Sequence, residues 1–72
     1  MKSKKILINE KNINKLKPGD IVKVGIAVLG RVLKVDKLEI EIKVLNDAYE
    51  PENIGKTGRW GISECDIIKV AN

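Results

Sequence analysis

Aliphatic and charged residues alternate in the middle of the chain. The clearest run is 38–45, where four aliphatic residues are separated by Glu39, Glu41 and Lys43. A period of two places all four aliphatic side chains on one face of an extended chain and the charged side chains on the other. We therefore predict a strand at 38–45 with one buried and one solvated face.

Other short aliphatic runs predict the rest of a sheet. Ile and Val dominate these runs, and β-branched side chains pack well on a pleated surface but lose rotamer freedom in a helix. No window carries apolar residues at the 3.6-residue period of an amphipathic helix. Besides 38–45, the expected strands lie at 5–9, at 21–24 with an extended continuation over 26–29, at 31–35, at 58–62 and at 67–70.

Turn-forming residues separate these runs. Proline presets φ and glycine supplies positive φ, so the sequence Lys-Pro-Gly-Asp at 17–20 is a strong turn signal. Ile13 and Leu16 are three positions apart, which suits one helical turn. The other expected connections are a two-residue turn at Asp36 and Lys37, a long polar loop at 46–57 and one helical turn at 63–66.

Five or six short strands in 72 residues predict one all-β domain. Closure into a small barrel leaves few exposed strand edges, so we expect a small barrel with one short helical turn before the last strand. The alternatives are an oligonucleotide- or oligosaccharide-binding barrel, which usually has a helix between its middle strands, and an open meander. We divide the chain into a basic arm at 1–17, with room for a first strand, and a barrel at 18–72.

The net charge of +4 is unevenly distributed along the chain. Residues 1–17 contain six lysines and a single acidic residue, Glu10, whereas residues 18–72 are close to neutral. Such an asymmetry is typical of a contact with nucleic acid or another anionic surface. It is also typical of a small domain that lysine keeps soluble. The charge alone does not choose between the two.

A single cysteine and the absence of histidine narrow the possible chemistry. Cys65 alone forms no intramolecular disulfide, which suits a reducing cytoplasm. Glu64 and Asp66 beside it disfavour the thiolate. Without histidine the chain lacks the commonest metal ligand and general base. No apolar run approaches the ~20 residues that span a bilayer. We therefore expect a cytoplasmic, non-catalytic protein with no cofactor, metal site, membrane contact or small-molecule substrate.

Two segments resemble a known family. The sequences PGDIVKV at 18–24 and GRVLKV at 30–35 resemble the KOW motif of ribosomal and transcription-elongation proteins with SH3-like barrels. The tail at 60–70 resembles the closing segment of such barrels, in which a strand, one helical turn and a last strand follow in that order. Small uncharacterised bacterial and phage proteins share this fold. The resemblance implies an SH3-like barrel that works with nucleic acid or the transcription or translation machinery. A KOW segment normally has a longer glycine- and lysine-rich loop where this chain has GIAVL at 25–29.

The leading hypothesis is therefore a binding module for RNA or DNA. Arg31 and Lys34 are three apart, so they point to opposite faces unless Gly30 introduces a bulge. The acidic residues between 36 and 52 would repel phosphate, although Glu39 and Glu41 are interpreted as a solvated strand face. The candidate nucleic-acid contacts are Lys2, Lys4, Lys5, Lys11, Lys15, Lys17, Arg31 and Arg59.

The alternative hypothesis is a protein-interaction module, for example a phage-encoded one, that docks through a barrel edge or the 46–57 loop. Tyr49 and Trp60, the two aromatic residues, are the candidate partner contacts. Trp60 shares a strand face with Ile62, and we expect it first of all to anchor a thin core. The competing interpretation is a stacking platform for a base or a groove for a peptide.

Overall fold

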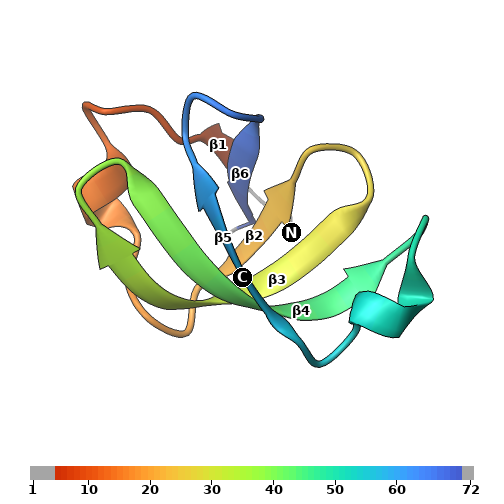
Figure 1. Cartoon of the computed structure of the whole chain (residues 1–72). Coiled ribbons are helices and arrows are strands. Elements are labelled where there is room, and N and C mark those ends of the chain that lie inside the picture. The colour runs from red at the N-terminus through yellow and green to blue at the C-terminus, as the bar shows by residue number, and fades with distance from the viewer. Residues whose placement is uncertain (1–4, 71–72) are drawn as a thin grey trace, which may run out of the picture.

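The structure is all-β, as predicted. The computed structural model describes residues 5–70. Figure 1 shows long, curved central strands and shorter strands around them. The strands are β1 (Lys5–Leu7), β2 (Ile21–Val24), β3 (Val28–Asp36), β4 (Glu39–Asp47), β5 (Thr57–Gly61) and β6 (Ile67–Val70), and two lone 3-10 turns are η1 (Ile13–Lys15) and η2 (Pro51–Asn53).

The six strands form one antiparallel sheet in the order β1-β6-β2-β3-β4-β5. β1 and β5 are the edges of this sheet, and within residues 5–70 they do not pair with each other. The sheet is therefore open, and the expected closure into a barrel is not seen. Nor does any helix in the described residues have the length and apolar character to cross a membrane.

The predicted strands at 21–24 and 67–70 are confirmed residue for residue. The predicted extended continuation over 26–29 is wrong in part, because residues 25–27 form a turn, and β3 begins at Val28, three residues before the predicted start at 31. The predicted turn at Asp36 and Lys37 lies one residue too early. Asp36 pairs with Glu39, so the two loop residues are Lys37 and Leu38. Lys37 takes a positive φ of 49° there.

Two irregularities bend the β3–β4 ladder. The register shifts between Leu29 and Gly30 and again between Val32 and Lys34. A bulge of this kind adds one residue to a strand, increases the local twist and reverses the faces of the side chains that follow. The second shift has the larger consequence for function, because it decides where the charged side chains of β3 point.

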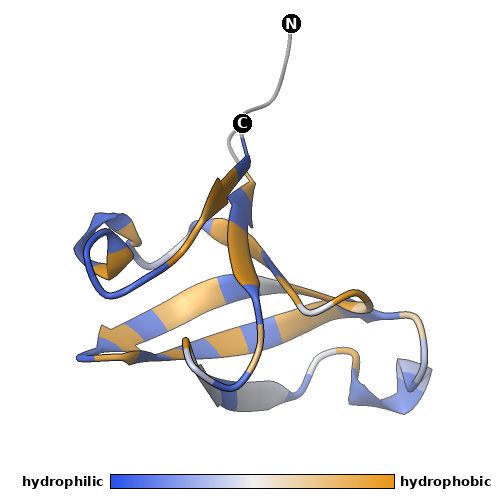
Figure 2. Cartoon of the chain, turned by 90° about the horizontal axis from the view of Figure 1, so that it is seen from above, coloured by the Kyte–Doolittle hydropathy of each residue, from blue (hydrophilic) through white to orange (hydrophobic). Residues whose placement is uncertain are grey.

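Aliphatic side chains from one face of the sheet make up the core. Figure 2 shows hydrophobic and hydrophilic residues alternating along the strands. Ile13, the first residue of η1, and Leu16, directly after it, are buried in this core, which confirms the single turn expected there. Trp60 and Ile62 pack against the core on the same side, as predicted. The buried hydrophobic cluster comprises Ile8, Ile13, Leu16, Val22, Val24, Val32, Ile40, Ile42 and Ile67.

The connection between β5 and β6 differs from the prediction. A helical turn was expected at 63–66, but residues 62–64 form a hydrogen-bonded turn that is not a helix. The turn begins earlier, at Gly61. The Glu64 N–H donates to the Gly61 carbonyl at 3.0 Å, and the Gly61 N–H donates back to Glu64 Oε1 at 2.6 Å. The Glu64 carboxylate thereby accepts a hydrogen bond from the last N–H group of β5.

Candidate functional site

Basic side chains gather on the outer face of the sheet, opposite the core. Arg31 pairs with Lys43, and Lys34 pairs with Glu41. Glu41 and Lys43 are two apart in β4 and share a face, so Arg31 and Lys34 share that face too. The register shift between Val32 and Lys34 causes this, because the shift at Gly30 precedes both residues and does not change their relative orientation.

The same face continues across β2, β6 and β1. Ile21 lies opposite both Arg31 and Val70, and Val70 lies opposite Lys5. Lys23, two residues after Ile21, is exposed on this face as well. Adjacent strands lie about 4.8 Å apart, so the path along the curved sheet from Lys5 to Arg31 is roughly 14 Å. We call this set the outer basic surface; it consists of Lys5, Lys23, Arg31, Lys34 and Lys43.

Arg59 engages two carboxylates of β4 that lie on the same face as the outer basic surface. Its Nη2 lies 3.2 Å from Glu41 Oε1, and its Nη1 lies 3.9 Å from Glu39 Oε1. In the part of the chain that the structure describes, no member of the outer basic surface forms an ion pair. Arg59 thus faces solvent, but it is not the free phosphate contact that was predicted. It offsets the acidic residues of β4 instead.

The structure separates the predicted lysines into different places. Lys5 belongs to the outer basic surface. Lys11, Lys15 and Lys17 are exposed, but they lie in the connection around η1, outside the strands. The predicted contacts Lys2 and Lys4 lie outside the described residues.

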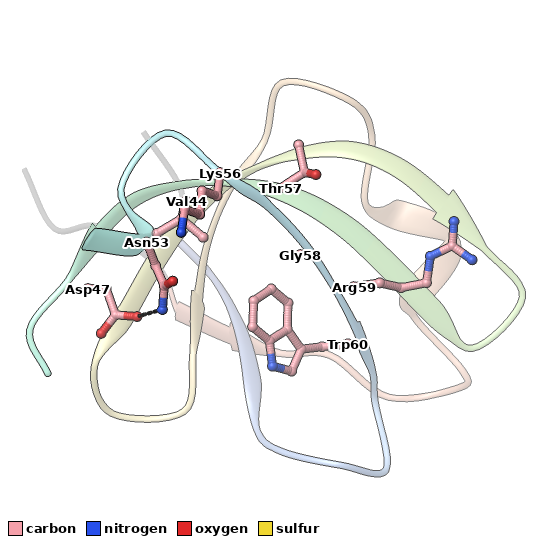
Figure 3. Close-up of a pocket in the computed structure, with 8 residues that line it drawn as sticks. All are labelled: Val44, Asp47, Asn53, Lys56, Thr57, Gly58, Arg59 and Trp60. Atoms are coloured by element: carbon pink, nitrogen blue, oxygen red, sulfur yellow. Dashed lines mark hydrogen bonds between the residues drawn. The ribbon is translucent and has the colours of Figure 1, made fainter. Parts of the chain in front are cut away.

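Trp60 lies against the core with one side and lines a pocket of about 360 Å³ with the other. The close-up in Figure 3 shows its indole below the β5 backbone, and Arg59 pointing away from it. Gly58 permits this position, because a Cβ there would overlap the far edge of the indole ring. We call this cavity the Trp60 pocket; its lining is Val44, Asp47, Asn53, Lys56, Thr57, Gly58, Arg59 and Trp60.

Asp47 fixes the loop that forms the far wall of the Trp60 pocket. Its Oδ1 accepts hydrogen bonds from the Tyr49 N–H at 3.1 Å and the Glu50 N–H at 2.9 Å. Its Oδ2 accepts one from Asn53 Nδ2 at 3.2 Å. The Glu50 N–H is the main cause that lowers the Asp47 pKa below its ordinary value of 3.8, and the Asn53 amide and the Tyr49 N–H act in the same direction against the effect of burial.

Two further residues were candidates from the sequence. Tyr49 is 71% exposed and does not line the Trp60 pocket. Cys65 is half-buried beside the core, and burial raises the pKa of its thiol above 9.0, with Glu64 and Asp66 adding to the shift. A raised pKa keeps the thiol protonated and unreactive at neutral pH.

Sequence reasoning missed Lys23, Lys34 and Lys43 as contacts. Strand alternation places Lys23 and Lys43 opposite the core, and this signal was available. The face to which Lys34 points depends on the register shift in β3, and nothing in the sequence clearly indicates that shift. Asn53 and Lys56, in the expected loop, were not singled out either.

Comparison with other proteins assigns no function to the outer basic surface or to the Trp60 pocket. No family model, curated protein or solved structure matches the chain. Within residues 5–70 no group of three or more His, Cys, Asp or Glu side chains is placed to hold a metal ion.

Proposed function

We propose that this chain is a non-catalytic nucleic-acid-binding module whose contact surface is the outer basic surface. Five cations on one face, none of them in an ion pair with a carboxylate of residues 5–70, match the charge of a phosphate backbone. Arg31 is suited to bidentate phosphate contacts, and the lysines act as point charges. Such contacts give affinity with little sequence preference.

The observation that carries this proposal is the pairing of Arg59 with Glu39 and Glu41. From the sequence, the acidic stretch was expected to repel phosphate. With both carboxylates held by Arg59, that repulsion is reduced where the outer basic surface approaches them. Asp36 pairs with Glu39 at the end of the hairpin, and its carboxylate limits the part of the surface that attracts phosphate.

We also propose that the open sheet is a member of the SH3-like class, with a KOW-like segment. That segment corresponds to β2 and β3, and the resembling tail corresponds to β5, the turn after it and β6. The first part falls on two consecutive strands, whereas the tail has the two expected strands without the helical turn between them. Membership of this class favours an association with the transcription or translation machinery.

Binding of a fluorescein-labelled oligonucleotide, followed by anisotropy at several salt concentrations, tests the proposed function. If the protein neutralises four phosphates of a single strand, log K falls against log salt with a slope of about −3. The double substitution Arg31→Gln and Lys43→Gln removes two of these contacts, so the slope becomes shallower by about 1.4.

Lys37→Gln is the control for a cation outside the outer basic surface, and it removes one charge where the double variant removes two. Lys37 lies in the β3–β4 loop, six residues beyond Arg31 and so roughly 20 Å away along the strand. Its loss should leave the salt slope nearly unchanged. Absence of binding at low salt, or equal effects of the control and the double variant, would contradict the proposed function.

A second candidate function rests on the exposed apolar side chains of the 48–56 loop. Tyr49 is 71% and Ile54 47% exposed, a pair that suits a protein partner. A partner retained from nuclease-treated lysate by the wild-type protein, and lost with Tyr49→Ser, together with no oligonucleotide binding, would favour this function over the first.

A further inference from the structure

The lining of the Trp60 pocket combines three kinds of group. The indole of Trp60 offers an aromatic face, Asn53 offers a carboxamide, and Lys56 offers a cation at the same cavity. Its volume of about 360 Å³ is at the lower end of the range of small-molecule sites, roughly 300–1,000 Å³. The pocket therefore suits a ligand no larger than one flat ring system with its substituents.

Hydrogen bonds within the loop hold the Asn53 amide in place. One of its two N–H groups donates to Asp47 Oδ2 at 3.2 Å, and Asp47 is itself fixed by two backbone N–H groups. A carboxamide has two donors and one acceptor oxygen, so Asn53 retains one N–H and its Oδ1 for a ligand. That donor and acceptor form the pair with which Asn recognises the edge of a base.

We propose that the Trp60 pocket receives one unpaired base of a single-stranded nucleic acid whose backbone lies on the outer basic surface. This inference rests on the proposed function and restricts its ligand to single strands. The base stacks on the Trp60 indole, and its edge meets Asn53. In a duplex the base faces and pairing edges are occupied, so only an unpaired base fits.

The path from the outer basic surface to the pocket runs around the edge of the sheet. Arg59 and Trp60 are consecutive in β5 and lie on opposite sides of that strand (Figure 3). β5 is an edge strand, so no further strand of the sheet blocks the passage. Lys56, just before β5, places another cation where the phosphate of the turned-in nucleotide would lie.

Trp60 is the only tryptophan of the chain, so its fluorescence reports on the pocket alone. The experiment compares oligothymidylate with an abasic oligonucleotide of equal length and charge. A base stacked on the indole quenches the emission, and it strengthens binding by about 5- to 150-fold relative to the abasic strand. The abasic strand should bind through the outer basic surface without quenching.

Variants locate the base-dependent part of the affinity. Trp60→Leu should bring the affinity for oligothymidylate down to that for the abasic strand, as measured with labelled oligonucleotides. Asn53→Ala keeps the stacking surface and loses the contact with the base edge, so it should remove part of this difference. Ile26→Ala, which removes an exposed apolar side chain in the turn between β2 and β3, should leave the difference unchanged. Asn53→Ala keeps the test decisive if Trp60→Leu does not fold, because Asn53 lies outside the core cluster.

The outcomes separate this inference from the proposed function. Equal affinity for both strands, without quenching and without an effect of Asn53→Ala, would overturn the base pocket and leave the outer basic surface intact. If neither strand binds at low salt, both proposals fail together.

Discussion

At the scale of single residues, Asp47 is the best example of a side chain whose role depends on its local partners. It is buried at the end of β4, and all its hydrogen-bond donors come from the next six residues. The sequence showed Asp47 only as one of several acids in a polar stretch. Its partners follow from the loop conformation, which composition does not reveal.

Asp47 should make stability depend on pH. Its pKa is lowered in the folded state, so its contribution is fully present above its ordinary value of 3.8 and is lost as the pH falls through the lower folded value. Asp47→Asn does not titrate. The difference in unfolding free energy between wild type and this variant, measured in urea, should therefore shrink as the pH is lowered from neutral to about 2. A constant difference over that range would contradict the assignment.

Gly30 is required by close packing. It is buried in β3, and a Cβ at this position would overlap the Ile42 side chain. We expect Gly30→Ala to lower the unfolding free energy by about 1–3 kcal/mol, the usual cost of overpacking a core. Chemical denaturation measures this directly.

The control for Gly30 is a double-mutant cycle with Ile42→Val, which removes the Cδ1 atom that the new methyl group meets. If the overlap is the cause, the two substitutions together cost less than their sum. Strict additivity would show that Gly30→Ala destabilises for another reason.

At the scale of elements, the strands were predictable and their connections were less so. The β2 and β6 runs are short, β-branched and bounded by turn residues, so their limits were predicted correctly. The β3–β4 hairpin was shifted by one residue because its loop, Lys37 and Leu38, contains no Gly or Asn to mark it. The register shift after Val32 was not predictable either, although the shared face of Arg31 and Lys34 depends on it.

The hairpin loop offers a prediction at this scale. Lys37 has a positive φ of 49°, a conformation that favours glycine over residues with a Cβ. Lys37→Gly should therefore raise the unfolding free energy by about 0.5–1 kcal/mol in thermal or chemical denaturation. Leu38 does not share the positive φ, so Leu38→Gly should not stabilise. Destabilisation by both substitutions would show that the loop does not hold Lys37 under strain.

At the scale of the whole molecule, the charge distribution was only partly visible in the sequence. The lysine excess at 1–17 drew attention to the N-terminal quarter, whereas the structure adds a second set of cations on the face opposite the core. Only Lys5 and Arg31 belong to both the predicted contacts and the outer basic surface. The difference arises because a sheet brings together residues from β1, β2, β3 and β4 that are far apart in sequence.

Residue-by-residue mapping of the contact by NMR tests the central claim most directly. Oligothymidylate is titrated at low salt into the ¹⁵N-labelled full chain, and amide chemical shifts are followed. We predict that, besides the changes a base causes at the Trp60 pocket, amide shifts change in β2, β3 and β4, at Lys23, Arg31 and Lys43, and that the changes in these strands fade as salt is added. Shifts that spare these strands, or none at any salt concentration, would contradict the outer basic surface as the binding site.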